Sequence, residues 1–206
     1  MRFVFSFALA LIALAGITAA GAQTPKKEAT AVAIFAGGCF WCMEPPFDKT
    51  EGVISTTSGY TGGTTVNPSY EEVSAGGTGH IESVKIVYDP SKVSYEELLH
   101  VFWRNIDPIR KNAQFCDTGS HYRSAIFYLD EEQKELSEKS KAELEESGRF
   151  TRPIVTEIHE AAPFYPAETY HQDYYTKNPN RYSFYRWNCG RDQRLEQIWG
   201  DEAGGH

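Results

Sequence analysis

A buried strand that runs directly into a cysteine-bearing helix constrains this chain more than any other feature. Residues 31–38, AVAIFAGG, are apolar and end in a Gly-Gly turn. Residues 39–50, CFWCMEPPFDKT, follow at once and are expected to open a short helix that Pro45 and Pro46 distort or interrupt. A strand and a helix that adjoin in this way indicate an α/β domain with a thiol at their junction.

The rest of the chain continues the alternation of strands and helices. Further strands are expected in residues 80–90, 122–130 and 153–160, and further helices in residues 94–107 and 131–147. Ser94 and Glu97 have the spacing of a capping box at the start of the first of these helices. The order predicts a compact two-layer α/β sandwich with a mixed sheet against helices.

Two segments have no clear period. Residues 58–79, SGYTGGTTVNPSYEEVSAGGTG, are predicted to be loop because of their glycine content. Residues 164–200 are crowded with aromatic side chains. We expect them to wrap the sandwich as a long C-terminal ordered loop that ends in one short helix.

The N-terminus has the layout of a secretory signal peptide, with Arg2, an apolar run and an Ala-x-Ala pattern that predicts cleavage after Ala22. The alternative is an uncleaved anchor, but the apolar run is short for a bilayer span. Residues 23–30 would then be a polar lead-in, 31–200 one catalytic domain and 201–206 a flexible tail. The mature protein is expected to be exported to the periplasm or secreted, free of the membrane and monomeric.

Charge and cysteine content limit the partners further. The net charge is −8 and basic residues are not clustered, which argues against a nucleic-acid partner. Export would place the four cysteines in an oxidising compartment. Four cysteines are few for a domain of this length, so we expect the core to be stable without disulfides.

Cys39 is the first candidate for chemistry. At the start of a helix, free amide donors and the positive end of the helix dipole stabilise a thiolate. Phe40 and Trp41 beside it could form an apolar slot for a methyl group. The alternatives are a cysteine that only packs, or one bridged to Cys42, with Phe40 and Trp41 as ordinary core residues.

Glu82 is the second candidate. It shares one face of the strand with Val84, Ile86 and Tyr88, so an acid continues an apolar stripe. A carboxyl desolvated there would keep its proton to higher pH, as a general acid requires. The alternative is that Glu82 lies beyond the strand end, in water.

Tyrosine hydroxyls are neutral donors that can hold an oxygen atom without adding charge. Tyr70 follows Asn-Pro-Ser, and Tyr122 opens a predicted strand. Most tyrosines in so aromatic a chain pack in the interior, and periodicity does not single out these two.

An ordered set of motifs resembles the peptide methionine sulfoxide reductase A family. These motifs are GCFWCMEPPF, GYTGG, NPSYEEV, GTGHIESVKIVYDP, FCDTGSHYRSAIF, YHQDY and NCGRDQRLEQIWG. The resemblance covers roughly residues 30 to 200 and implies a ferredoxin-like α/β sandwich. It also implies reduction of the S epimer of methionine sulfoxide in oxidised proteins, and possible use of the free amino acid.

The resemblance implies the roles of the site residues. Cys39 would attack the sulfoxide sulfur, and Glu82 would protonate its oxygen while Tyr70 and Tyr122 hold that oxygen. The remaining residues would bind the substrate: Phe40, Trp41, Asp117, His171 and Tyr174. His121 stands where the family commonly has Gln, which could alter a hydrogen bond near the site.

The oxygen would leave on Cys39 as a sulfenic acid, which a second thiol condenses to a disulfide. Cys42 is the first choice for this thiol because it lies one helical turn from Cys39. Cys189 is the second choice, either directly or as a relay, and Cys116 is expected to be a structural thiol. A thioredoxin-like dithiol outside the cytoplasm would reduce the disulfide, with no metal or organic cofactor.

Rival interpretations remain open at this point. A thiol–disulfide oxidoreductase would use the Cys39-x-x-Cys42 pair but gives Glu82 and the tyrosines no role. A cysteine hydrolase would pair Cys39 with a histidine such as His171, but the papain-type signature is absent. A zinc site lacks a second cysteine pair at finger spacing. A secreted disulfide protein without enzymatic activity would bridge Cys39 permanently.

Overall fold

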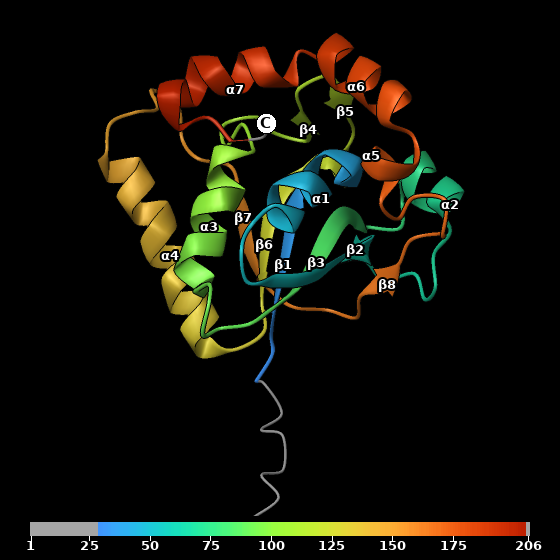
Figure 1. The fold of residues 1–206 in the computed structure, drawn as a ribbon, viewed down its shortest axis with the longest axis horizontal. Coiled ribbons are helices and arrows are strands. Elements are labelled where there is room, and N and C mark those ends of the chain that lie inside the picture. The colour runs from blue at the N-terminus through green and yellow to red at the C-terminus, as the bar shows by residue number, and fades with distance from the viewer. Residues whose placement is uncertain (1–28, 205–206) are drawn as a thin grey trace, which may run out of the picture.

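The computed structural model describes residues 29–204, in which a six-stranded mixed sheet forms the centre (Figure 1). Its strands are β1 (Ala31–Gly37), β2 (Val53–Thr61), β3 (Ile81–Tyr88), β6 (Ser124–Tyr128), β7 (Glu157–Glu160) and β8 (Tyr165–Pro166). Their order is β7-β6-β1-β3-β2-β8, and only β6 and β7 run parallel. A separate hairpin pairs β4 (Ala113–Gln114) with β5 (Asp117–Thr118). The predicted signal peptide, residues 1–22, lies outside the described residues.

Seven α-helices accompany the sheet in the described part of the chain. They are α1 (Phe40–Asp48), α2 (Tyr70–Ala75), α3 (Tyr95–Arg104), α4 (Glu131–Glu146), α5 (Tyr174–Lys177), α6 (Pro179–Asn188) and α7 (Arg191–Trp199), with short 3-10 turns η1 (Ser120–Tyr122) and η2 (Gly200–Glu202). In Figure 1, α3 and α4 lie on one side of the sheet, and α6 and α7 cross its upper end. Within residues 29–204, no helix is long and apolar enough to span a membrane.

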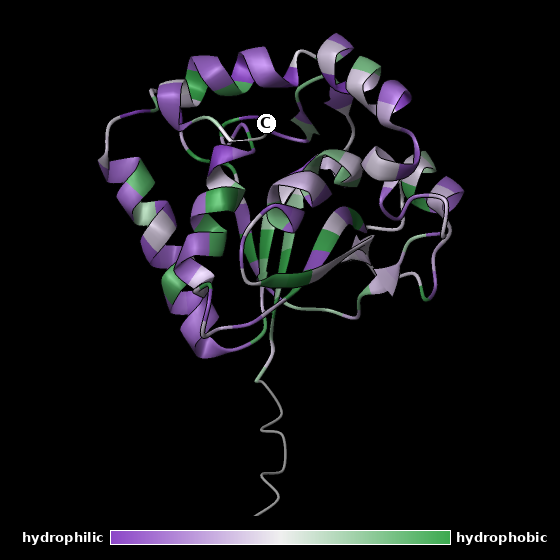
Figure 2. Cartoon of the chain, in the orientation of Figure 1, coloured by the Kyte–Doolittle hydropathy of each residue, from purple (hydrophilic) through white to green (hydrophobic). Residues whose placement is uncertain are grey.

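Alternation along the strands divides the core between the two faces of the sheet. On β1, Phe35 faces the helices and its ring stacks on those of Phe47, 5.5 Å away, and Phe102, 5.0 Å away. Ile34 faces the other way, into a smaller cluster that Phe164 covers. The central strands are accordingly green, the hydrophobic colour, over much of their length in Figure 2. The predicted α/β architecture with a mixed sheet is confirmed.

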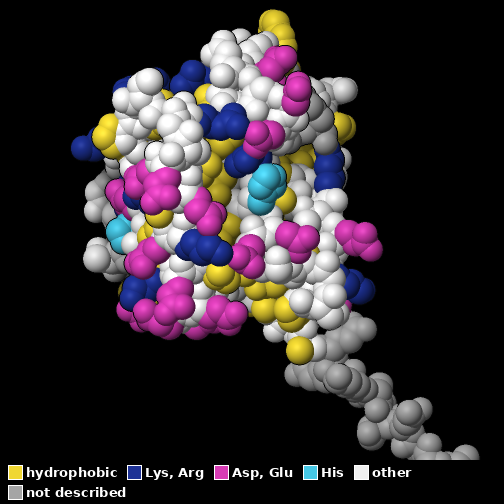
Figure 3. Space-filling model, turned by 90° about the vertical axis from the view of Figure 1, so that its left-hand side faces the viewer, with side chains coloured by type: hydrophobic (Ala, Val, Ile, Leu, Met, Phe, Trp, Pro, Cys, Tyr) yellow, Lys and Arg dark blue, Asp and Glu magenta, His cyan; other side chains and the backbone are white. Residues whose placement is uncertain are grey.

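The outer face of α3 and α4 is a mixed-charge surface around a hollow (Figure 3). The hollow encloses about 220 Å³ and is lined by Leu99, His100, Trp103, Leu136, Lys139 and Leu144, among others. Lys139 lies 3.8 Å from Glu96 across it. The indole N–H of Trp103 donates to Ser140 Oγ at 3.0 Å and joins the two helices beneath the charges.

The capping box predicted at Ser94 and Glu97 is present at the start of α3. A second one, formed by Ser69 and Glu72, starts α2 within residues 58–79. The prediction of loop for that segment was therefore wrong, because glycine content hid both this helix and the end of β2. The Ser69 side chain accepts a hydrogen bond from the Glu72 backbone N–H, and the Glu72 side chain accepts one from the Ser69 backbone N–H. Two backbone N–H groups at the start of this six-residue helix are thereby satisfied.

Pro45 and Pro46 were expected to distort or interrupt the first helix; interruption was wrong, because α1 continues through both. Proline removes a donor, but the carbonyl groups of these prolines still find partners at the helix end. Lys49 N–H donates to the Pro45 carbonyl at 3.2 Å, and Thr50 Oγ1 donates to that of Pro46 at 2.9 Å. Both prolines are buried, so packing against the sheet compensates for the lost helical bonds.

The aromatic segment 164–200 is more helical than predicted, since α5 and α6 precede the expected final helix. Helix α6 begins with Pro179 at its first position, a favoured site for proline. Its Phe184 and Trp187 are each 64% exposed. Apolar residues on the solvent side break the periodicity by which an amphipathic helix is recognised, so the sequence pattern missed it.

Candidate active site

The turn that carries Cys39 requires glycine. Gly38 links β1 to α1 with φ +86°, a left-handed conformation, and a Cβ placed on it would lie 2.5 Å from Gln114 Cβ. The turn sets Cys39 at the N-cap of α1, as predicted. Cys39 is nevertheless only 6% exposed, so the thiol is nearly enclosed.

Glu82 on β3 lies against the start of the same helix. The Phe40 N–H donates to Glu82 Oε2 at 3.1 Å, so the carboxyl binds the residue next to Cys39. Glu82 is 1% exposed, and this burial raises its pKa to about 8 although the Phe40 N–H acts in the opposite direction. The acid therefore keeps its proton at neutral pH, as the strand alternation predicts.

Cys39 and Cys42 form a hydrogen-bonded thiol pair. Burial, followed by that bond, raises the pKa of Cys39 well above its ordinary value. The bond from Cys39 lowers the pKa of Cys42 to about 7 against the effect of burial, with help from Arg191 and Arg186. Burial therefore acts on Cys39 against the helix start, which was expected to favour a thiolate there. Of the two thiols, Cys42 has the lower pKa.

Tyr70 and Tyr122 belong to two different elements near this site. Tyr70 is the first residue of α2, and Tyr122 ends the turn η1 instead of opening β6. Burial is the main cause that raises the pKa of each phenol, and the neighbouring ionisable groups of Glu82 and Cys39 raise both further. Both are thus neutral donors near the acid and the thiol. His121, the departure from the family pattern, lies with its ring 4.1 Å from that of Tyr122.

Trp41 is held by two side chains from the segment around α5. Its indole N–H donates to His171 Nδ1 at 3.0 Å, and Tyr174 stacks on its ring at 3.7 Å. Phe40, which is buried, lies 4.9 Å from the His171 ring. The structure therefore brings together four residues that the sequence predicted to bind substrate: Phe40, Trp41, His171 and Tyr174.

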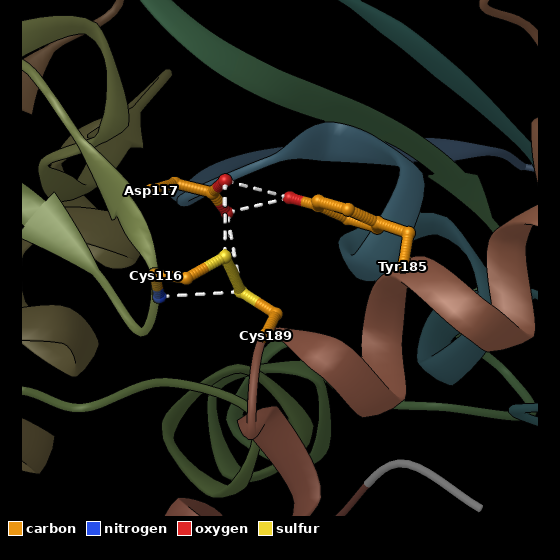
Figure 4. The surroundings of a disulfide bond; sticks show 4 residues. All are labelled: Cys116, Asp117, Tyr185 and Cys189. Carbon is orange, nitrogen blue, oxygen red and sulfur yellow. Dashed lines mark hydrogen bonds between the residues drawn. A yellow bond between two sulfur atoms is a disulfide. The ribbon is translucent and has the colours of Figure 1, made fainter.

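Asp117 on β5 reaches the site through a residue that the sequence analysis missed. The Tyr185 hydroxyl donates to the Asp117 carboxyl at 2.7 Å (Figure 4), and its ring meets Trp41 edge-on at 5.9 Å. Burial raises the pKa of Asp117, and the bond from Tyr185 opposes that effect. Tyr185 is one of 12 tyrosines and its sequence context carries no signal.

Beside Asp117, Cys116 and Cys189 form a disulfide of 2.09 Å across a separation of 73 residues (Figure 4). The prediction that Cys116 is a free structural thiol was therefore wrong. The free cysteines in residues 29–204 are Cys39 and Cys42. Cys116, Asp117 and Cys189 have ligand atoms within 4.8 Å of one another, but both sulfurs are occupied by the disulfide.

Comparison with known proteins assigns the family. The sequence model described as peptide methionine sulfoxide reductase matches residues 31–203. The chain belongs to that family. The reductase is 54% identical to MsrA of Bacillus licheniformis, over 85% of this chain and 95% of that protein. It is 56% identical to MsrA of Ligilactobacillus salivarius, over 81% and 96%. The chain is therefore an oxidoreductase of the MsrA type.

Solved structures agree with the fold. The reductase matches methionine sulfoxide reductase A of Corynebacterium diphtheriae with a TM-score of 0.66 and 35% identity, over 75% of this chain and 77% of that one. It matches reduced Mxr1 of Saccharomyces cerevisiae with a TM-score of 0.67 and 32% identity, over 73% and 87%. The mixed α/β fold described above is thus the fold of this enzyme family.

Proposed function

We propose that Cys39 attacks the sulfur of methionine sulfoxide while Glu82 protonates its oxygen. One observation carries this proposal: a carboxyl that is protonated at neutral pH binds the backbone N–H of the residue next to Cys39. A sulfoxide sulfur becomes a good electrophile only when its oxygen takes up charge, so acid and nucleophile must act on one S=O bond. Cys42, whose pKa is lowered to about 7, accepts the proton of Cys39.

Tyr70 and Tyr122 hold the sulfoxide oxygen as it gains negative charge. Their neutrality supports this role, because a charged donor would lower the pKa of Glu82. Phe40 and Trp41 form the slot for the methyl group. This slot is positioned by His171 and Tyr174, which both contact Trp41. Asp117 contributes through its hydrogen bond with Tyr185.

The oxygen ends on Cys39 as a sulfenic acid, and methionine leaves. Cys42 then condenses with the sulfenic acid, which releases water and forms the Cys39–Cys42 disulfide. The direct hydrogen bond of the two thiols supports Cys42 as the resolving residue, with Cys189 as the alternative. An external thioredoxin-like dithiol supplies two electrons for each turnover, and no metal or organic cofactor takes part.

The substrate is the S epimer of methionine sulfoxide in oxidised proteins, with the free amino acid as a second substrate. We further propose that residues 1–22 direct export to the periplasm or outside the cell, where a monomeric catalytic domain of residues 31–200 works. Residues 201–204 were expected to belong to a flexible tail but are held against the domain: Glu202 binds Arg149 at 2.7 Å, and the Gly204 N–H donates to the Arg104 carbonyl at 2.9 Å. The order β6-β1-β3-β2, with each neighbour antiparallel, supports the ferredoxin-like assignment. The position of α6 and α7 across one end of the sheet supports a C-terminal wrap.

A second candidate is a thiol–disulfide oxidoreductase. The pKa of Cys42, lowered to about 7 in a Cys-x-x-Cys motif, favours it. It leaves the buried Glu82 without a role, and a buried acid is costly to keep without one.

A stereoresolved assay separates the two candidates. Residues 23–206 are incubated with each sulfoxide epimer of a blocked methionine and excess dithiothreitol, and methionine is quantified. We expect turnover of the S epimer alone and none by Cys39→Ser. Turnover of the R epimer alone would overturn the assigned stereochemistry. Disulfide exchange without any methionine would favour the second candidate.

A further inference from the structure

Glu168 lies between β8 and α5, and its carboxyl joins two other elements of the site. Its Oε1 accepts a hydrogen bond from the Tyr70 backbone N–H at 2.8 Å, and its Oε2 accepts one from the Tyr60 hydroxyl at 3.0 Å. Tyr70 is the first residue of α2, and Tyr60 on β2 lies directly opposite Glu82 on β3. One side chain therefore connects the start of α2 to the strand beside the acid.

The main chain around Glu168 is fixed to the sheet. The Gln172 side chain accepts from the Ser58 N–H and donates to the Ser58 carbonyl on β2, each at 2.9 Å. The Glu168 carbonyl accepts from the His171 N–H at 2.9 Å, and His171 in turn accepts from the Trp41 indole. The Glu168 carboxyl thus extends from a fixed base that also supports the methyl slot.

Helix α2 is attached to the domain by few of its own side chains. Of its six residues, only Val73 is buried. Gly76 and Gly77, which follow the helix, have φ of +84° and +91°, and a Cβ on either would meet nothing within 4 Å. The link after α2 is therefore loosely packed. The bond from the Tyr70 N–H to Glu168 fixes the end of the helix that carries the phenol.

The charge of Glu168 strengthens this contact. Burial acts to raise its pKa, but the backbone N–H of Tyr70, its own N–H and the Tyr60 hydroxyl outweigh burial, and the pKa lies below its ordinary value. Glu168 is therefore ionised at neutral pH, and both of its oxygens are acceptors. Hydrogen bonds to an ionised carboxylate are roughly twice as strong as bonds between neutral groups.

The two tyrosines of the site differ in what fixes their backbones. The Tyr122 N–H donates to the Gly119 carbonyl at 3.0 Å within its own turn, whereas the Tyr70 N–H donates to Glu168. A displacement of about 1 Å in a group that acts on the reacting atoms can lower a rate by about 100-fold. Loss of the Glu168 carboxyl should therefore disable Tyr70 and spare Tyr122.

We propose that Glu168 is a positioning residue that aims the hydroxyl of Tyr70 at the sulfoxide oxygen. The inference rests on the proposed function, in which Tyr70 and Tyr122 hold that oxygen. Glu168 acts through the backbone of Tyr70 and not on the substrate. Because its own carbonyl supports His171, the same residue sets the spacing between the group that holds the oxygen and the slot that holds the methyl group.

Two tyrosine backgrounds test this assignment. Glu168→Ala is introduced into Tyr122→Phe, where Tyr70 is the remaining hydroxyl of the two, and into Tyr70→Phe, where Tyr122 remains. Methionine formed in a single turnover is timed by rapid quench at saturating sulfoxide. We expect Glu168→Ala to slow the first background by about tenfold and the second by less than about twofold.

The other outcomes have distinct meanings. Equal losses in both backgrounds would indicate general loosening, and no loss in either would indicate no role. Both results overturn the positioning role while the proposed function stands. A double variant Tyr70→Phe, Tyr122→Phe that reacts at the wild-type rate would overturn the proposed role of the tyrosines, and the inference with it. As the control, Asp48→Ala removes a carboxyl that accepts from the Tyr175 hydroxyl at 2.9 Å, and it should act equally on both backgrounds.

Two further variants separate reach from charge. Glu168→Gln keeps an oxygen within reach of the Tyr70 N–H but loses the charge, and its rate should stay within about threefold of the wild type. Glu168→Asp keeps the charge but is one methylene shorter, and it should behave like Glu168→Ala. The reverse order would assign the effect to charge and overturn the positioning role. Urea denaturation verifies that each variant is folded, and if Glu168→Ala does not fold, these two variants in the same backgrounds decide the question.

Discussion

The inner cysteine pair, Cys39 and Cys42, and the outer pair, Cys116 and Cys189, differ in sequence separation, burial and bonding state. Cys39 and Cys42 are three positions apart, buried, and free in the structure. Cys116 and Cys189 are 73 positions apart, nearer the solvent, and bonded. Burial beside a neutral acid favours attack on a substrate from which water is excluded. Access favours exchange with another protein. The difference teaches that environment, and not the cysteine itself, divides these roles.

The neighbours of each pair reinforce this division. The inner pair has Glu82, whose burial raises its pKa to about 8, and the aromatic slot of Phe40 and Trp41. The outer pair has Asp117 and Tyr185, which reach the slot from outside. Five changes test whether the two regions have different roles.

Removal of the nucleophile should have the largest effect. We expect Cys39→Ser to lower the reduction of a methyl sulfoxide by at least about 1,000-fold, because no other group can accept the oxygen. Methionine formed in a single turnover is the measurement. Cys116→Ser, the outer counterpart, should retain the first turnover. Equal losses in both variants would erase the distinction between the pairs.

Removal of the acid should come next. Glu82→Gln is expected to slow the first step by about 100- to 1,000-fold with little change in substrate affinity. In the wild type, the protonated acid is the active form and its pKa is about 8. The single-turnover rate should therefore fall about tenfold per pH unit above that value. Rapid-quench measurements from neutral to alkaline pH test this. A variant that keeps the same alkaline decline would assign the decline to another group.

Removal of the Cys116–Cys189 disulfide by mutation should mainly lower the free energy of unfolding. Its two cysteines close a loop of 73 residues, so the double variant Cys116→Ser, Cys189→Ser should lose about 2–4 kcal/mol of unfolding free energy. Urea denaturation measures the loss. Cys42→Ser, which closes no loop in the resting protein, is the matched variant and should lose less. The reverse order would mean that the inner pair carries the stability.

Removal of the resolving thiol should affect cycling but not the first product. Cys42→Ser should yield about one methionine and then stall, which lowers steady-state turnover by more than about tenfold. Methionine release with a dithiol donor, followed from the first turnover onward, is the assay. Undiminished cycling would transfer the resolving role to Cys189.

The smallest effect is expected at the contact between the two regions. Tyr185→Phe removes the bond to Asp117 but keeps the ring beside Trp41, so the KM should rise about three- to tenfold with a smaller change in kcat. Tyr175→Phe removes a similar bond, from its hydroxyl to Asp48 at 2.9 Å, and serves as the control. An equal rise in KM for both variants would mean that general loosening, and not the slot, is the cause.

Local features of the sequence were sufficient to predict some positions in the structure. Glu82 followed from alternation on one strand, and Cys39 from a turn between strand and helix. The start of α3 followed from Ser94 and Glu97. These predictions succeeded because the interacting residues lie within one element or one turn.

The disulfide pairing and the role of Tyr185 could not be predicted from the sequence, for physical reasons. The pairing of Cys116 with Cys189 is one of three connectivities that four cysteines allow. Tyr185 lies on a helix whose exposed rings hide its period. The family resemblance assigned roles to Asp117 and His171, but it did not indicate that Tyr185 and Trp41 are their respective partners.

By itself, the sequence determined the strand, the glycine turn and the cysteine that follows it, because backbone sterics and hydrophobic alternation act over a few residues. Only the tertiary structure decided which of the two buried thiols has the lower pKa, which acid keeps its proton and which cysteines bond. Those properties depend on desolvation and on neighbours distant in the chain, which exist only after the sheet and helices have packed.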